Sequence, residues 1–210
     1  DWTFACRSGK GVHLAVKQVQ RNLQRFPWFV QVDVEHYFAS IDHQRMMHLL
    51  TNRFKGTACL RLFGRILETY HTSPGKGLPI GSLTSQHFAN LYLDAADRFF
   101  LYFPSVHAQI RYMDDIVWWC EDKLSAQQVL NAFQHFLEDD CLLRLKSTIR
   151  MNRSTVGMHY CGFRILPGVI RLPLRKKRRY RFLIDQYESA WLADKIDSKQ
   201  LQMAFASVVT

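Results

Sequence analysis

The sequence predicts an α+β fold, in which helices pack on one face of an antiparallel sheet. Two apolar runs, residues 107–111 and 116–120, are separated by a short polar stretch, so they pair as an antiparallel hairpin. The other helix-like and strand-like segments do not alternate in the way that a parallel sheet with crossover helices requires. The chain has 210 residues, of which 48% are hydrophobic and 13% aromatic, enough to bury a core in one large or two small domains.

The first third of the chain predicts three helices and one strand. Apolar residues recur at helical spacing over residues 11–26, and residues 28–34 form a β-rich run. Asp42 is suited to cap a helix over residues 43–54, because its carboxylate can accept a hydrogen bond from a backbone N–H of the first turn. A further helix is predicted over residues 58–70.

The rest of the chain continues this mixture of helices and strands. Proline and glycine interrupt residues 71–83, which therefore form a loop. Trp118 and Trp119 are expected to pack in the core or on the sheet. The same patterns predict helices at 85–102, 124–137, 176–191 and 198–208, and strands at 142–149 and 158–166.

Two adjacent carboxylates stand at the tip of the central hairpin. Asp114 and Asp115 lie between the two apolar runs, and a third acid, Asp33, closes the strand at residues 28–34. A lone aspartate at a strand end is usually a turn or capping residue. If that strand lies beside the hairpin, however, the three carboxylates meet at one end of the sheet. Carboxylate ligands suit Mg²⁺, and a pair of metal ions favours phosphoryl transfer.

Positive charge is concentrated in one segment toward the C-terminus. Between Cys141 and Ile184 there are twelve Lys and Arg and no Asp or Glu, whereas the rest of the chain holds 16 basic and 18 acidic residues. The net charge of +10 therefore comes from this segment alone. Strand-like apolar residues interleave the charges, so we expect an ordered surface for a nucleic acid rather than a solvated basic face.

Other features argue against several classes of protein. The five cysteines are scattered and never in CxxC spacing, which disfavours a disulfide framework and a zinc site. No run approaches the roughly 18 uncharged apolar residues of a membrane span, and no N-terminal signal segment is visible. The sequence therefore predicts a cytoplasmic protein without a membrane partner.

Five motifs follow one another along the chain. They are residues 33–43, residues 78–93, Tyr112-Met113-Asp114-Asp115, Lys146-Ser147-Thr148 and Tyr160-Cys161-Gly162-Phe163. In this order they resemble the first catalytic motif, the loop and helix that contact template and nucleotide, the catalytic box, the lysine motif and the primer-grip hairpin of reverse transcriptases. The resemblance covers nearly the whole chain and implies a reverse-transcriptase palm with partial fingers and a partial helical thumb.

Two departures from the usual pattern indicate which lineage of the family the chain resembles. Most reverse transcriptases carry Gln before the loop glycine and Pro after its serine, whereas this chain has Ile80 and Gln86. This pattern and residues 6–15 resemble the reverse transcriptases of diversity-generating retroelements, which copy a template RNA with errors opposite adenine and work with a small basic accessory protein. Ile80 suggests a physical reason for the errors, because an apolar side chain replaces an amide that could hydrogen-bond the incoming nucleotide.

The resemblance implies roles for the carboxylates and for Lys146. Asp33 and Asp114 would bridge two Mg²⁺ ions, with Mn²⁺ as a substitute, and Val34 would add a backbone carbonyl. Asp115 would complete the metal-binding set and adjust the charge and geometry of the site. One ion would lower the pKa of the primer 3′-hydroxyl and the other would hold the triphosphate. Lys146 would protonate or neutralise the leaving pyrophosphate, or make one phosphate contact among many.

The resemblance also assigns residues that touch nucleotide and nucleic acid. Phe38 would be the steric gate that excludes a ribose 2′-hydroxyl, because Tyr37 and Phe38 cannot face the same side of an extended segment. Gly81 would allow close approach of a ligand or form a simple turn, and Ser85 would contact nucleotide or cap a helix. The nucleotide-binding set is Phe38, Ile80, Gly81, Ser85 and Gln86. The nucleic-acid-binding set is Arg7, Lys10, Tyr112, Met113, Tyr160, Gly162, Arg175, Lys176, Lys177, Arg178 and Arg179.

The same resemblance divides the chain into three parts. Residues 1–27 would be a remnant of the fingers and residues 28–172 the palm, with a fingers-like helical insertion at about 43–75, and residues 173–210 would begin the thumb. The family's fingers hairpin has no counterpart before Arg7, and the thumb resemblance stops short. We therefore expect a truncated enzyme.

The expected function is error-prone synthesis of DNA on RNA by a reverse transcriptase of the diversity-generating type. Its partners would be template RNA, a DNA primer or cDNA, dNTPs and the accessory protein. The alternatives are a reverse transcriptase of a retron, a group II intron or a phage-defence system. A further alternative is a catalytically idle RNA-binding fragment that uses the basic segment alone.

Overall fold

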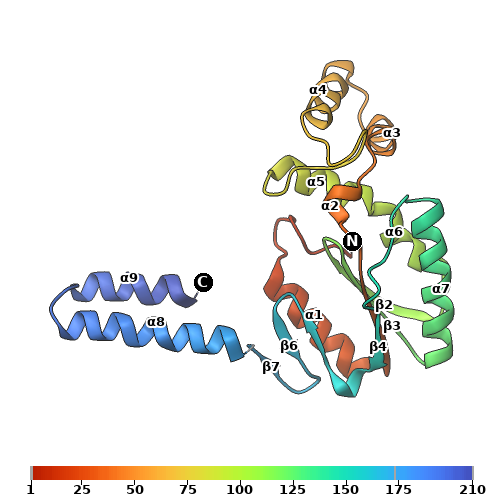
Figure 1. The fold of residues 1–210 in the computed structure, drawn as a ribbon. Helices are drawn as coiled ribbons and strands as arrows, with labels where there is room; N and C mark the ends of the chain where they lie inside the picture. Colours follow the sequence, from red (N-terminus) through yellow and green to blue (C-terminus); the bar gives the residue numbers. More distant parts are fainter. Residues whose placement is uncertain (1, 173, 210) are drawn as a thin grey trace.

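The computed structural model describes residues 2–172 and 174–209 and has an antiparallel four-stranded sheet at its centre (Figure 1). The strand order is β2-β3-β1-β4, with β1 (Trp28–Asp33), β2 (Val106–Tyr112), β3 (Asp115–Cys120) and β4 (Arg150–Arg153). A second, three-stranded antiparallel sheet contains β5 (Met158–Tyr160), β6 (Phe163–Ile165) and β7 (Ile170–Arg171). The predicted α+β class is confirmed.

Helices cover the central sheet and extend from it in two directions. The helices α3 and α4 pack on each other beyond α5, whereas α8 and α9 form a hairpin that projects sideways from the small sheet (Figure 1). Among the described residues the helices are α1 (Val12–Arg25), α2 (Tyr37–Ser40), α3 (His43–Arg53), α4 (Thr57–Glu68), α5 (Leu83–Tyr92), α6 (Asp94–Phe99), α7 (Lys123–Asp139), α8 (Leu174–Leu192) and α9 (Ser198–Val209), with 3₁₀ turns η1 (Phe100–Tyr102) and η2 (Ser154–Val156).

Alternate residues of the central strands face two separate hydrophobic clusters. Val32 and Trp118 belong to a cluster with buried residues of α5, α6 and α7. Val117 and Trp119 belong to a second cluster with α1 and the small sheet. Because side chains alternate along a strand, the two adjacent tryptophans are fully buried on opposite faces. The face opposite the predicted helical layer is therefore covered as well, by α1 and the small sheet.

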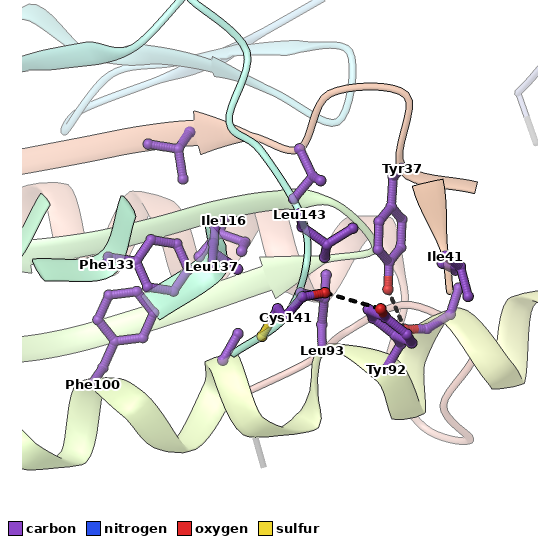
Figure 2. Close-up of a cluster of buried hydrophobic side chains, with 14 of the residues drawn as sticks. Tyr37, Ile41, Tyr92, Leu93, Phe100, Ile116, Phe133, Leu137, Cys141 and Leu143 are labelled. Carbon is purple, nitrogen blue, oxygen red and sulfur yellow. Dashed lines mark hydrogen bonds between the residues drawn. The ribbon is translucent and has the colours of Figure 1, made fainter. Parts of the chain in front are cut away.

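The larger cluster combines aromatic packing with hydrogen-bonded tyrosines (Figure 2). The rings of Phe100 and Phe133 are 4.8 Å apart between centroids. The hydroxyl of Tyr92 donates to the carbonyl of Cys141 at 2.9 Å, and that of Tyr37 donates to the carbonyl of Ala89. Burial raises the pKa of Tyr92 to about 12, so its hydroxyl remains a donor at neutral pH. The polar ends of these rings are satisfied within the core.

Two predicted strands differ from the structure. The segment predicted as a strand at 142–149 is mostly irregular. It meets the end of β1 at an isolated bridge between Leu145 and Val34, where the N–H of Lys146 donates to the carbonyl of Asp33 at 2.8 Å, and the regular strand, β4, begins at Arg150. The single strand predicted at 158–166 is the hairpin β5–β6. Its turn contains Cys161 (φ 47°) and Gly162 (φ 77°), which reverse the chain between two apolar stretches.

The helix predicted at 85–102 begins earlier and is broken. It starts at Leu83, with Ser82 in the N-cap position, so the predicted capping role of Ser85 was wrong. The helix ends at Tyr92, because the φ of −93° and ψ of 9° at Leu93 are not helical, and α6 follows directly. Asp97 of α6 faces β2, where it accepts hydrogen bonds from Gln109 and Arg111. By contrast, the predicted N-cap Asp42 is confirmed, since it accepts from the backbone N–H of Arg45 at 2.9 Å.

A buried arginine joins the end of β2 to α5 and α6. The guanidinium of Arg111, which is 1% exposed, donates to both carboxylate oxygens of Asp97 at 2.7 Å. It also donates to Oδ1 and the carbonyl of Asn90, at 3.1 and 3.3 Å, and to the carbonyl of Met113 at 3.1 Å. All five N–H donors of the guanidinium are therefore used. Burial acts to lower the pKa of Arg111, but the bonds to Asp97 outweigh it and raise the pKa.

The N-terminal segment adds a short parallel pairing at the outer edge of β2. The N–H of Arg111 donates to the carbonyl of Trp2 at 3.0 Å, and its carbonyl accepts from the N–H of Phe4 at 2.9 Å. The side-chain amide of Asn90 donates to the carbonyl of Ala5 at 2.9 Å. These bonds fix residues 2–5 against both the sheet and α5.

Removal of Arg111 from this network should destabilise the fold strongly. Arg111→Met leaves the Asp97 carboxylate buried without its partner, so urea denaturation should show a loss of about 3–5 kcal/mol in the free energy of unfolding. Arg98→Ala is the matched control, because it breaks an exposed ion pair with Asp94 in the same helix. That change should cost less than about 1 kcal/mol. Similar small losses for both variants would contradict the stabilising role of the buried pair.

Candidate active site

Three aspartates lie together at one end of the central sheet. Asp33, the last residue of β1, is the direct partner of Asp115, the first residue of β3. The N–H of Val34 donates to the carbonyl of Asp114 at 3.3 Å, which brings the second hairpin acid to the end of β1. The antiparallel register therefore gathers residues that are about eighty positions apart in the sequence.

The hairpin that carries two of these acids has a tight and unusual turn. Tyr112 pairs with Asp115, so Met113 and Asp114 form a two-residue loop. Met113 has a φ of 56°, a left-handed conformation that a side chain of this kind rarely adopts. Its carbonyl accepts a hydrogen bond from the buried Arg111. The hydrogen bond from Arg111 therefore stabilises the turn in this conformation.

The surroundings of the carboxylates disfavour the charged forms of Asp114 and Asp115. Burial, with a smaller contribution from Asp33 and Asp114, raises the pKa of Asp115 to about 7, although a hydrogen bond from Gln31 acts against this. Burial and the neighbouring Asp33 also raise the pKa of Asp114. Lys146 partly compensates, with its ammonium 2.5 Å from Asp33 Oδ1. The hydrogen bond to Asp33 is the main reason that the pKa of Lys146 is raised.

The donor set is suited to Mg²⁺, although its side chains are not already arranged around an ion. In the described ranges, no group of three His, Cys, Asp or Glu side chains is placed to hold a metal. Asp33 nevertheless binds a cation in the form of the Lys146 ammonium. Because burial disfavours the charged forms of Asp114 and Asp115, an added cation with a preference for oxygen ligands would relieve an existing cost.

A cavity of about 330 Å³ opens beside the carboxylates, between the central sheet and the β5–β6 hairpin. The hydroxyl of Tyr160, in β5, donates to the backbone carbonyl of Asp115 at 3.3 Å. The lining comprises Gln31, Val32, Asp33, Asp115, Lys146, Thr148, Arg150, His159, Tyr160, Cys161 and Gly162. Two acids, Lys146, Tyr160 and Gly162 from the predicted site therefore share one cavity.

The first turn of α8 lies against the turn of this hairpin. The ammonium of Lys176 is 5.5 Å from the centroid of the Phe163 ring, and a Cβ added to Gly162 would lie 2.9 Å from that ammonium. Glycine therefore permits the close approach of Lys176. Exposed basic residues continue from this contact along the helix, namely Arg175, Lys177, Arg178 and Arg179.

The residues predicted around α5 form a separate group. Ile80 is 85% exposed in the loop before α5, and Gly81 follows it with a φ of 95°. Neither lines the cavity beside the carboxylates. Gln86 accepts a hydrogen bond from the thiol of Cys6 at 2.9 Å, which ties it to the N-terminal segment. Ser85, in contrast, is 3% exposed inside α5 and is not presented to solvent.

Two predicted basic contacts lie on the N-terminal segment. Arg7 is exposed. The ammonium of Lys10 donates to the carbonyl of Thr3 at 3.2 Å and lies over the ring of Phe4. Burial, followed by the charge of Arg7, lowers the pKa of Lys10.

The segment after β1 is a helical turn and not an extended strand. Tyr37 and Phe38 both belong to α2, so the prediction that they point apart because the segment is extended was wrong. Tyr37 is buried in the core, whereas Phe38 is half-buried with its ring 5.7 Å from that of Tyr37. Successive positions in a helix are rotated by about 100°, so the two side chains leave the helix in different directions although their rings are in edge-to-face contact.

Two polar residues that support the site do not stand out in the sequence. Arg111 ends a predicted apolar strand, and Gln31 belongs to none of the motifs. Each interrupts a run of strand residues at a buried position, and that interruption is the signal that could have revealed them. Arg111 contacts the turn between β2 and β3, and Gln31 contacts Asp115.

Comparison with known proteins identifies related chains. Residues 1–183 match the family described as "Reverse transcriptase (RNA-dependent DNA polymerase)". Group II intron-encoded protein LtrA from Lactococcus lactis subsp. cremoris is 29% identical over 108 residues, which are 48% of this chain and 18% of that protein. An uncharacterized 91 kDa protein in the cob intron of Schizosaccharomyces pombe is 27% identical over 99 residues, 44% of this chain and 12% of its own length.

Solved structures show the same fold at much lower sequence identity. Apo telomerase from Candida tropicalis aligns with a TM-score of 0.61 and 9% identity, over 99% of this chain and 45% of that chain. The likeness supports the fold, and the aligned region is less than half of the telomerase chain. Because the family match covers most of the sequence, including all three aspartates, the chain belongs to the reverse transcriptase family.

Proposed function

We propose that the protein is an RNA-directed DNA polymerase that uses template RNA, a DNA primer or cDNA, and dNTPs. The observation that carries this proposal is the meeting of Asp33, Asp114 and Asp115 at one end of the sheet, in a chain of the reverse transcriptase family. The matched part covers only 12–18% of the two intron relatives, so the proposal concerns the full-length protein. In it, residues 1–27 belong to the fingers, 28–172 to the palm and 173–210 to the thumb.

Different residues of the site would have different roles in nucleotidyl transfer. Two Mg²⁺ ions, or Mn²⁺, held by Asp33, Asp114 and the carbonyl of Val34, would activate the primer 3′-hydroxyl and neutralise the triphosphate. Asp115 adjusts the charge beside them. Lys146 is held beside the site by its ion pair with Asp33, and its ammonium would protonate or neutralise the departing pyrophosphate. The exposed basic residues at the start of α8 would follow the nucleic-acid backbone.

Within the family, we favour an error-prone enzyme of the diversity-generating type, with a small basic accessory protein as partner. Ile80 supports this assignment, because its exposed apolar side chain stands beside Gly81 where most members carry a glutamine. The competing assignment is a group II intron reverse transcriptase, which the relationship to LtrA favours. The two differ in how errors are distributed over template bases.

Replacement of Asp114 should abolish polymerisation. Asp114→Asn keeps the shape of the side chain but removes its charge, so Mg²⁺-dependent dNTP incorporation on an RNA template should fall by more than about 100-fold. Asp122→Asn is the control, since Asp122 only caps α7 beyond the far end of β3 and should leave the rate unchanged. An unaltered rate in Asp114→Asn would contradict the site. RNA binding by an inactive wild-type protein, with or without Mg²⁺, would favour the idle RNA-binding alternative.

Removal of the Phe38 ring should relax selection against ribonucleotides. If the ring excludes the 2′-hydroxyl, Phe38→Ala should raise the ratio of rNTP to dNTP incorporation by at least about 10-fold in primer-extension assays. Phe136→Ala removes a partly buried ring of α7 that packs on the same core, and it should leave the ratio unchanged. Equal ratios in the wild type, Phe38→Ala and Phe136→Ala would contradict the assignment of Phe38 as the steric gate.

A glutamine at position 80 should improve accuracy opposite adenine. Ile80→Gln restores an amide that can hydrogen-bond the nucleotide, so errors opposite adenine should fall about fivefold, the factor that a hydrogen bond of ~1 kcal/mol supplies. Ile80→Leu retains an apolar side chain and should retain the errors. Sequencing of the cDNA measures both. Wild-type errors spread evenly over all template bases would instead support the intron type.

A further inference from the structure

Gln31 contacts Asp115 directly from the neighbouring strand. Its amide nitrogen donates to the two carboxylate oxygens of Asp115, at 3.0 and 3.2 Å, and to the carbonyl of His159 at 3.0 Å. All three neighbours accept hydrogen bonds, which fixes the nitrogen of the amide toward them. One N–H is shared by the two carboxylate oxygens and the other points to His159.

Packing alone does not account for a glutamine at this position. The residue is 8% exposed, and its Oε1 is buried without a hydrogen-bond partner among the described residues. Such an orphaned acceptor costs about 1–3 kcal/mol. Phe29, Val117 and Trp119 on the same face of the sheet are apolar and buried. A methionine would fill a similar volume without the orphaned oxygen, so the amide has a use other than packing.

The amide also joins Asp115 to the β5–β6 hairpin. His159 and Tyr160 are consecutive residues of β5. The first accepts from Gln31, and the hydroxyl of the second donates to the backbone carbonyl of Asp115 at 3.3 Å. The hairpin is therefore bonded to the side chain of Asp115 through Gln31 and to its backbone directly. A displacement of the hairpin would disturb both sets of bonds.

We propose that Gln31 is a positioning residue, which fixes the orientation of the Asp115 carboxylate and makes it depend on the placement of the β5–β6 hairpin. This inference rests on the proposed polymerase function. A primer end seated against the hairpin, at the cavity that Gln31, Asp115 and His159 line together, would thereby act on the geometry of the carboxylate. Binding of the primer end and orientation of the Asp115 carboxylate would therefore be coupled through Gln31.

The test compares Gln31→Met with a matched change at a second buried glutamine. Gln109 is also 8% exposed, and its amide donates to the backbone carbonyl of Asp97, away from the three aspartates. In Gln31→Met, Mn²⁺ affinity measured by electron paramagnetic resonance should fall about 10-fold, and kcat for dNTP incorporation should fall about 10–100-fold. The Kd for primer–template should stay within about twofold, because the basic contacts remain. Gln109→Met should leave Mn²⁺ affinity and kcat unchanged.

Thermal unfolding separates positioning from a structural role. Gln31→Met removes an orphaned acceptor but also takes a donor from the Asp115 carboxylate and from the carbonyl of His159. Its unfolding midpoint should therefore fall no further than that of Gln109→Met, which loses its own buried amide bond. Wild-type Mn²⁺ affinity in Gln31→Met, or a loss matched by Gln109→Met, would overturn the inference. Gln31→Leu provides the same comparison if the methionine variant does not fold. Absence of dNTP incorporation by the wild type would overturn the proposed function, whereas the Mn²⁺ measurement would still decide the role of Gln31.

Discussion

The buried guanidinium of Arg111 is the interaction on which the arrangement of the site depends. It bonds to Asp97 in α6, to Asn90 in α5 and to the carbonyl of Met113 in the turn between β2 and β3. A buried charge tolerates very few arrangements, because every donor must keep an acceptor. One side chain therefore fixes two helices and the turn that carries Asp114 relative to one another.

The acidic end of the sheet, in contrast, brings together carboxylates whose charged forms are disfavoured by burial. Burial raises the pKa of Asp114 and Asp115, and the turn between the strands holds Met113 at a left-handed φ. Lys146 offsets only part of the negative charge through Asp33. Strain and unfavourable charge gathered at one place are typical of functional sites, and here the satisfied network around Arg111 lies directly beneath them.

Local patterns explain what could be predicted from the sequence. The Asp114 hairpin, the cap at Asp42 and most helices depend on neighbours in the chain, so periodicity and turn chemistry identify them. The burial of Ser85 and the break at Leu93 depend on tertiary packing, so local patterns do not reveal them. The role of Gln31 cannot be predicted from local patterns for the same reason, because its hydrogen-bond acceptors on β3 and β5 are distant in sequence.

Residues 2–4 close part of the outer edge of the central sheet, where the N–H and carbonyl of Arg111 pair with Trp2 and Phe4. An uncovered edge strand is a template for pairing with another molecule. Fragments of this protein that begin beyond Phe4 would leave these two backbone groups of β2 without their partners. The N-terminal segment thus protects part of this edge from pairing with another molecule.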